Sequence, residues 1–214
     1  MARERKARKR EDNEIEFGRI VAFSDGVFSI AITLLVLNIG VKAGLPHHLL
    51  AHELWEQREN LLAYAISFAV IGRFWVVHHG FFSEVMAFDG RLIGLNMLYL
   101  GWVVLIPFSS QVLGDYGGQL AAVVLYSANL AGVVLIGQWM AWDARRAGLT
   151  SIDGVTQLES LIRSIYIAGV FLFSIVVALF DAGIAPFCWF LLFAEPSGHL
   201  VRRITDRQTQ RRPS

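Results

Sequence analysis

Long stretches without a charged residue dominate the chain. Residues 92–114, 116–142, 164–180 and 182–194 contain no Asp, Glu, Lys or Arg. A helix needs about 20 apolar residues to cross a hydrocarbon layer about 30 Å thick. The pattern therefore predicts an all-α, polytopic membrane protein.

Six membrane-spanning helices are predicted, the last of them short. They cover residues 20–41, 61–79, 92–113, 119–142, 161–180 and 182–193. The last segment corresponds to only about 18 Å of helix, so it either ends short of one interface or takes in flanking residues. We divide the chain into a basic N-terminal arm (1–16), a transmembrane domain (17–194) and a basic C-terminal tail (195–214).

The composition agrees with a membrane protein. Hydrophobic residues make up 55% of the 214 residues and charged residues 17%, against about 25% charged in an average soluble domain. These values exclude a disordered protein, a coiled coil and a nucleic-acid-binding domain. The sequence contains no nucleotide loop, catalytic triad or metal-ligand set, so we expect neither an enzyme nor a cofactor. Cys188 is the only cysteine, which excludes an intrachain disulfide.

The basic residues predict the orientation in the membrane. With six spans, 17 of the 19 Lys and Arg residues fall on the side of the termini, and only Lys42 and Arg58 on the other. Cytoplasmic loops carry such an excess, so both termini are expected to be cytoplasmic. We interpret the arm Arg3–Arg10 as a topology anchor. Contact with RNA or anionic lipid is the alternative.

Two other motifs have weak functional interpretations. His48 and His52 lie one helical turn apart in the outer loop, but no third ligand follows, so a solvated loop is favoured over a metal site. The segment Gly114–Gly118 superficially resembles a potassium filter, but it lacks the preceding Thr-Val and is expected to form a turn.

Several polar side chains lie within the first three predicted spans, at similar depth. They are Asp25, Arg73, Trp75, His78, His79, Asn96 and Trp102. A charged Asp inside a membrane needs protein or water around it, and an Asp, a His, an Asn and an indole N–H at one level can satisfy one another by hydrogen bonds. We favour a buried polar clasp that joins three helices. A proton relay or an ion site is the alternative.

The first span also carries a smooth aliphatic stripe. At 100° per residue, Ile30, Leu34 and Leu37 lie within about 60° of one another, while Asp25 is about 140° away. Thr33 lies beside the stripe. Lipid contact or helix packing is the usual role of such a stripe, but it can also line a pore with a hydrophobic constriction.

The first span contains a long motif. The pattern Arg19-x-x-x-Phe23-Ser24-Asp25, followed by Gly-Val-Phe-Ser-Ile-Ala-Ile-Thr-Leu-Leu-Val-Leu, resembles the bacterial branch of the transmembrane protein 175 family, whose members are potassium-permeable channels. The similarity continues through Phe74-Trp75 and His78-His79 to Asn96 and Pro107-Phe108, about half of the chain. The chain departs from the family at Ser109-Ser110, where a second proline is expected.

The resemblance implies a fold and an assembly. Bacterial members have six spans, and four chains surround one central pore in the cell membrane. The first spans line that pore, and rings of aliphatic side chains, here Ile30, Leu34 and Leu37, form its constriction. Thr33 occupies the position implicated in selectivity, so permeant potassium passes Ile30 and Thr33. The motif Arg19, Phe23, Ser24 and Asp25 packs against the second and third spans.

The resulting hypothesis is a homotetrameric, potassium-selective cation channel in a bacterial plasma membrane, with potassium ions, the lipid bilayer and copies of the chain as its partners. Two other classes remain open. A proton-coupled transporter would use Asp25, His78 and His79, although no inverted repeat is visible. A non-conducting membrane scaffold would use the aliphatic stripe only for packing.

Overall fold

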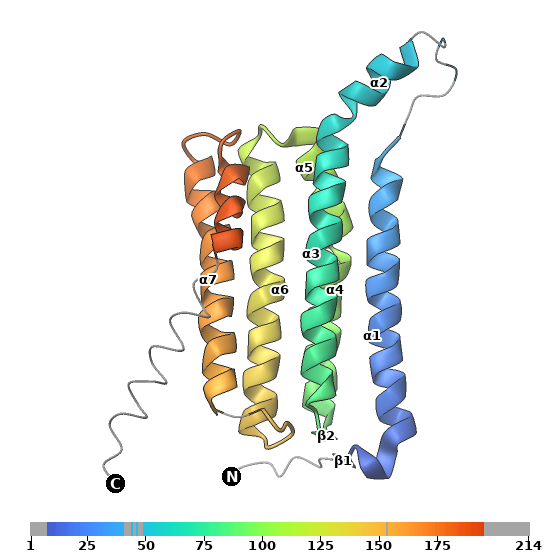
Figure 1. Ribbon diagram of the computed structural model, residues 1–214, viewed down its shortest axis with the longest axis vertical. Helices are drawn as coiled ribbons and strands as arrows, with labels where there is room; N and C mark the ends of the chain where they lie inside the picture. The colour runs from blue at the N-terminus through green and yellow to red at the C-terminus, as the bar shows by residue number, and fades with distance from the viewer. Residues whose placement is uncertain (1–7, 41–43, 45, 47–48, 153, 195–214) are drawn as a thin grey trace.

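The computed structural model describes residues 8–40, 44, 46, 49–152 and 154–194. Long helices lie side by side in an elongated bundle (Figure 1). The helices are α1 (Glu14–Leu34), α2 (Leu50–Glu56), α3 (Arg58–Ser83), α4 (Gly90–Val104), α5 (Ile106–Tyr116), α6 (Leu120–Arg146) and α7 (Gly154–Ala178). Three 3₁₀ helices, η1 (Glu11–Asn13), η2 (Leu35–Asn38) and η4 (Ala185–Ala194), and two short strands, β1 (Arg8–Lys9) and β2 (Ala87–Phe88), complete the described elements.

Five helical segments in the described part of the chain are long and apolar enough to cross a membrane. They coincide with the first five predicted spans, which confirms the predicted class of fold. The second and third extend a few residues beyond both predicted limits, whereas the first ends at Leu37, four residues before its predicted limit, and the fifth ends at Ala178, two residues before its own. The sixth predicted segment is the 3₁₀ helix η4, which packs against α7. Ten residues rise only about 20 Å in this conformation, so the six-helix count stays a prediction.

The third predicted span is a broken helix. Regular α-helix stops at Leu105, between α4 and α5, and Pro107 stands at the start of α5. Proline has no N–H and interrupts the helical ladder. At this break Asn129 of α6 donates its amide Nδ2–H to the carbonyl oxygen of Trp102 at 3.0 Å, and Ser109 donates to Asn129 Oδ1 at 2.9 Å. Side chains of α5 and α6 therefore stabilise the break.

The end of the bundle where α1 begins, called here the N-terminal end, is held by backbone pairing. β1 pairs antiparallel with β2, and Val85 forms a bridge with Thr150. Beneath these strands, Phe17 packs against Phe82 and Phe88, with ring centroids 6.1 and 5.8 Å apart. The start of α1 is thereby joined to two turns that lie far from it in the sequence. This small sheet was not predicted from the sequence.

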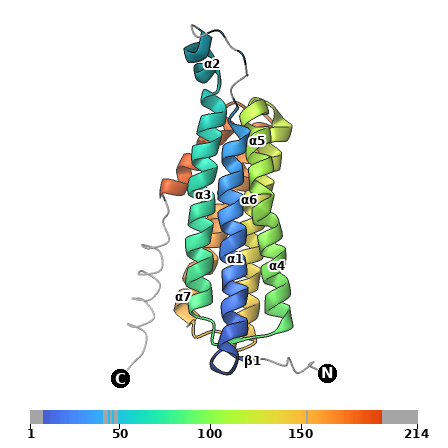
Figure 2. The same ribbon diagram turned by 90° about the vertical axis from the view of Figure 1, so that its right-hand side faces the viewer.

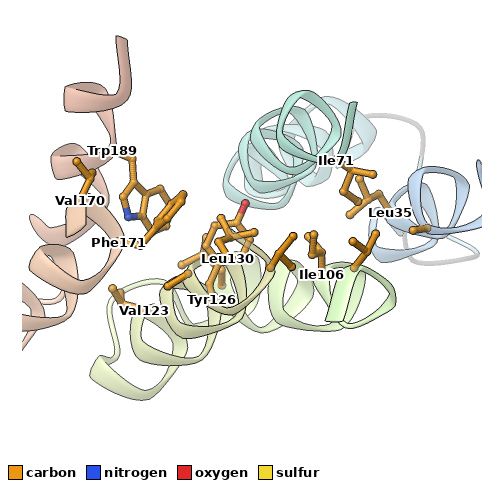
Figure 3. Packing of buried hydrophobic residues seen from close by; sticks show 14 of the residues in the cluster. Leu35, Ile71, Ile106, Val123, Tyr126, Leu130, Val170, Phe171 and Trp189 are labelled. Atoms are coloured by element: carbon orange, nitrogen blue, oxygen red, sulfur yellow. The ribbon is translucent and has the colours of Figure 1, made fainter. Parts of the chain in front are cut away.

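The main core runs across the width of the bundle. Figure 3 shows Leu35, Ile71 and Ile106 towards one side of the buried cluster, and Val170 and Trp189 towards the other. Hydroxyl pairs cross the same interior: Ser67 with Ser110 and Tyr126, and Ser127 with Ser174. These pairs satisfy polar groups between helices that are otherwise apolar.

Helix α1 lies at the edge of the bundle, packed on α3 and α4. Figure 2 shows it in front of the other helices. Its inner face consists of Ser24, Phe28 and Ala31, continued by Leu35 of η2, and all four residues are buried. Val27 and Ile32 beside this face are half-buried, and the opposite face is uncovered in the single chain.

Three sequence predictions concern residues at the margins of the described structure. Residues 1–7 of the basic arm, Lys42, His48 and the C-terminal tail lie outside the described residues. His52 is on α2, and no group of three metal-ligating side chains occurs among the residues that the structure describes. The Gly114–Gly118 segment spans the last turn of α5 and the turn that precedes α6.

Candidate functional site: the two faces of helix α1

The uncovered face of α1 and η2 is apolar. Ile30 is 58% exposed, Leu34 38% and Leu37 73%. Phe23 is exposed as well. The structure thus places the predicted constriction residues together on the surface of a single chain, where lipid or another protein chain is needed to cover them.

Thr33 lies on the same uncovered face. Its Oγ1 hydroxyl donates to the carbonyl oxygen of Ile30 at 2.9 Å. The hydroxyl hydrogen is used within the helix, so the oxygen presents its lone pairs outward as an acceptor. Such an oxygen accepts a hydrogen bond from a water molecule or coordinates a cation.

The buried face of α1 carries a chain of three polar side chains. His78 of α3 pairs through Nε2 with Asn96 Oδ1 of α4 at 2.8 Å, and Asn96 Nδ2 donates to Ser24 Oγ of α1 at 3.0 Å. Ser24 in turn donates to the carbonyl oxygen of Ile20 at 2.9 Å. All three side chains are almost fully buried. The chain therefore joins three helices at one level.

The hydrogen bond from Ser24 to the Ile20 carbonyl determines which group donates in each of the other two. Because the Ser24 hydrogen points to a carbonyl, its oxygen accepts from the Asn96 amide, and the Asn96 carbonyl then faces His78. A carbonyl only accepts, so His78 carries its proton on Nε2. Phe28, Phe82 and Tyr99 surround the imidazole, with ring centroids 5.4, 4.6 and 5.4 Å away.

A second contact lies at the edge of the α1–α3 interface. Trp75 Nε1 donates to Asp25 Oδ1 at 2.8 Å, and the indole stacks on His79 with centroids 5.5 Å apart. Asp25 is half-buried and the two rings are exposed. Arg19 is also exposed, closer to the N-terminal end of α1. The predicted clasp is thus divided into a buried part and a peripheral part.

Two other polar residues of these spans, Arg73 and Trp102, lie away from the clasp. Arg73 is about 160° around α3 from Trp75 and lines a cavity between α3, α6 and α7. Trp102 is about 120° around from Asn96, and its ring packs against Gly132 of α6. Both residues lie at a depth similar to the clasp but take no part in it, because similar depth along a helix does not place side chains on the same face. Sequence reasoning also missed Phe28 and Tyr99, which wall the imidazole and carry no polar signal.

Comparison with known proteins identifies the family. The family model described as endosomal/lysosomal potassium channel TMEM175 matches residues 19–107, which extend from α1 into α5 and include both clasp contacts. The chain belongs to the TMEM175 family. It is a membrane protein, and the relatives that it matches are named ion channels.

Three relatives show the extent of the similarity. A potassium channel of Streptomyces collinus is 43% identical over 139 residues, which cover 62% of this chain and 66% of that protein. The endosomal/lysosomal proton channel TMEM175 of Gallus gallus is 38% identical over 108 residues, 46% of this chain and 21% of that protein. The crystal structure of a lysosomal potassium-selective channel TMEM175 homologue from Chamaesiphon minutus has a TM-score of 0.68 and 29% identity, and the match covers 84% of this chain and 95% of that one.

The chain spans about two thirds or less of the length of these curated relatives. The similarity to the Chamaesiphon structure, in contrast, extends over most of both chains. The family signal is concentrated in the segment that contains the uncovered apolar face of α1, whereas the fold similarity extends through α6 and α7.

Proposed function

We propose that this protein is a potassium-selective cation channel, in which the uncovered faces of α1 from four chains line one central pore. The observation that carries this proposal is the exposure of Ile30, Leu34 and Leu37 on a helix whose opposite face is fully packed. Four such faces around an axis cover one another and leave a narrow apolar passage. The names of the family relatives support ion conduction through such a passage.

In the proposed pore, Ile30 forms the narrowest ring, with Leu34 and Leu37 beyond it. Aliphatic rings offer no oxygen ligand, so an ion crosses them with part of its water shell. Potassium holds its water less strongly than sodium does, which favours potassium at a dry constriction. Thr33 lies next to the ring, and its outward oxygen accepts from the retained waters or contacts the ion itself.

The polar contacts behind the pore hold α1 in place in this proposal. The chain from His78 through Asn96 to Ser24 ends on a backbone carbonyl and passes through an amide, which does not relay protons. This arrangement supports a structural clasp over the proton-coupled transporter. As a result, Ile30, Leu34 and Leu37 stand on a helix that is held in a fixed position. In the proposed orientation, both termini face the cytoplasm of a bacterial cell.

Ion flux in liposomes that hold the purified protein tests the proposal. Potassium flux well above sodium flux is expected, and Ile30→Asn is expected to raise flux and to reduce the discrimination. Ile165→Asn is a matched control, because Ile165 of α7 is 60% exposed but lies on a different helix. Flux that is unchanged by Ile30→Asn would remove this residue from the pore. Absence of flux in both the wild type and the Ile30→Asn variant would favour the scaffold, and saturable uptake driven by a pH gradient would favour the transporter.

A further inference from the structure

A cavity of about 540 Å³ lies between α3, α6 and α7, in the half of the bundle next to the N-terminal end. Figure 1 shows α6 between α3 and α7. Val77, Val134 and Ile167 are among its apolar walls. His78 and Tyr99 also line the cavity, so it reaches the His78 end of the clasp, but none of the predicted pore residues Ile30, Thr33, Leu34 and Leu37 lines it.

Two arginines line this cavity at a similar depth. Arg73 lies ten residues before the end of α3 at Ser83, about 15 Å along the helix. Arg163 lies nine residues after the start of α7 at Gly154, about 14 Å along the helix. Among the described residues, none forms a hydrogen bond or an ion pair with Arg73. A guanidinium within a membrane span is costly unless water or an anionic group accompanies it.

A buried amide in the same cavity lacks an acceptor. Gln157 of α7 is 6% exposed, and its Nε2 group has no hydrogen-bond partner within the described structure. The Nε2 group is a donor only, so its missing partner is an acceptor oxygen. Cations and a donor that face one cavity together fit a ligand rich in acceptor oxygens, as a phosphate is.

The depth of the site indicates where such a ligand comes from. Trp139 and Trp142 are exposed on α6, one to two turns before its end, and Arg146 lies over the Trp142 ring at 5.2 Å. Exposed tryptophans mark the headgroup level of a bilayer. The two arginines lie within about two helical turns of this level. Long arginine side chains span such a distance by extending towards the interface. The phosphodiester of a lipid is therefore within reach.

The carboxylates of the cavity lie closer to the N-terminal end than the arginines. Glu159 precedes Arg163 by one turn of α7, and Glu84 follows the end of α3, where it accepts from Ser151. This order, with cations inside and carboxylates outside, matches a headgroup whose phosphate is followed by an ammonium.

We propose that this cavity binds one phospholipid with a zwitterionic ethanolamine headgroup. The phosphodiester lies between Arg73 and Arg163 and accepts from Gln157, the ammonium lies near Glu159, and an acyl chain follows the apolar wall. The site is separate from the proposed pore, and its occupancy is measured without any ion current.

Native mass spectrometry of the purified protein in detergent, titrated with phosphatidylethanolamine, tests the proposal. The wild type is expected to retain lipid, and Arg73→Gln and Arg163→Gln are each expected to weaken retention about tenfold or more, since hydrogen bonds to charged groups have this magnitude. Arg58→Gln is the matched control, because Arg58 stands on α3 at the opposite end, outside the cavity. Equal retention in the wild type and both cavity variants would overturn the proposal.

Two further arms identify the ligand and guard against misfolded variants. Diacylglycerol, which lacks the phosphate, and inorganic phosphate, which lacks the chains, are each expected to compete poorly with phosphatidylethanolamine. Equal competition by either one would overturn the phospholipid as occupant. Gln157→Glu keeps the size of the side chain and places a negative charge beside the phosphate, so it is expected to weaken retention even if an arginine variant fails to fold. Retention unchanged by Gln157→Glu would count against the proposed position of the phosphate.

Discussion

Asn96 donates its amide to Ser24 across the interior of the bundle at 3.0 Å, although 72 residues separate them in the sequence. The same amide group faces His78 through its carbonyl. One side chain of α4 therefore satisfies polar groups on α1 and α3 at once. The hydrogen bond between Asn96 and Ser24 on the buried side of α1 therefore helps to position the uncovered face on its other side.

The first prediction concerns Asn96. Asn96→Leu leaves the His78 Nε2–H without its acceptor and the Ser24 oxygen without its donor, in a dry interior. We expect the free energy of unfolding to fall by about 1–3 kcal/mol. Thermal unfolding of the purified protein in detergent measures the change. Ser24→Ala removes only one end of the chain and should have a smaller effect, while Ser29→Ala, on the exposed side of α1, should have almost none. Stability unchanged in Asn96→Leu would contradict the role of the clasp.

The second prediction concerns the pair of Asp25 and Trp75. Asp25→Ala removes the acceptor at the edge of the α1–α3 interface, so α1 loses its orientation and the fraction of assembled oligomer is expected to fall. Asp25→Asn keeps an acceptor oxygen for the indole and should preserve assembly. Size-exclusion chromatography coupled to light scattering measures the oligomer. A stable oligomer of Asp25→Ala with altered selectivity would instead place Asp25 in the conduction path.

The third prediction concerns Thr33. Thr33→Val keeps the shape of the side chain and removes the outward oxygen, so discrimination between potassium and sodium is expected to fall several-fold. Thr33→Ser restores the oxygen and should restore most of the discrimination. Reversal potentials under mixed potassium and sodium gradients report the ratio directly. If valine and serine behave alike, the hydroxyl does not take part in selectivity.

The fourth prediction concerns the close approach of α4 and α6. A Cβ atom at Gly132 would lie 2.3 Å from the nearest ring carbon of Trp102, so Gly132→Ala forces a large ring or a helix to move. We expect a loss of about 1–3 kcal/mol in the free energy of unfolding, as overpacked interiors show. Gly169→Ala in α7 is the control, because nothing lies within 4 Å of its Cβ position. Thermal unfolding distinguishes the two. Trp102→Leu should partly rescue Gly132→Ala if the ring is the obstacle.

The sequence predicted the parts of this protein that depend on one helix at a time. The length of an uncharged run must match the hydrocarbon layer, so five spans were placed correctly, and 100° per residue was enough to place Ile30, Leu34 and Leu37 on one face. The break before Pro107 also has a local cause, the missing N–H of proline. The hydrogen bond from Asn129 to the Trp102 carbonyl at this break, in contrast, depends on the packing of two helices.

The tertiary structure alone decided which polar groups meet. Asp25 pairs with Trp75 and Ser24 with Asn96 because the rotation of each helix about its axis is set by packing against several neighbours, and no single segment encodes that rotation. The same packing turned Arg73 away from the clasp and into a cavity between α3, α6 and α7. Hydropathy determines that a segment enters the membrane, whereas the fit of side chains between helices determines which face of the segment is buried.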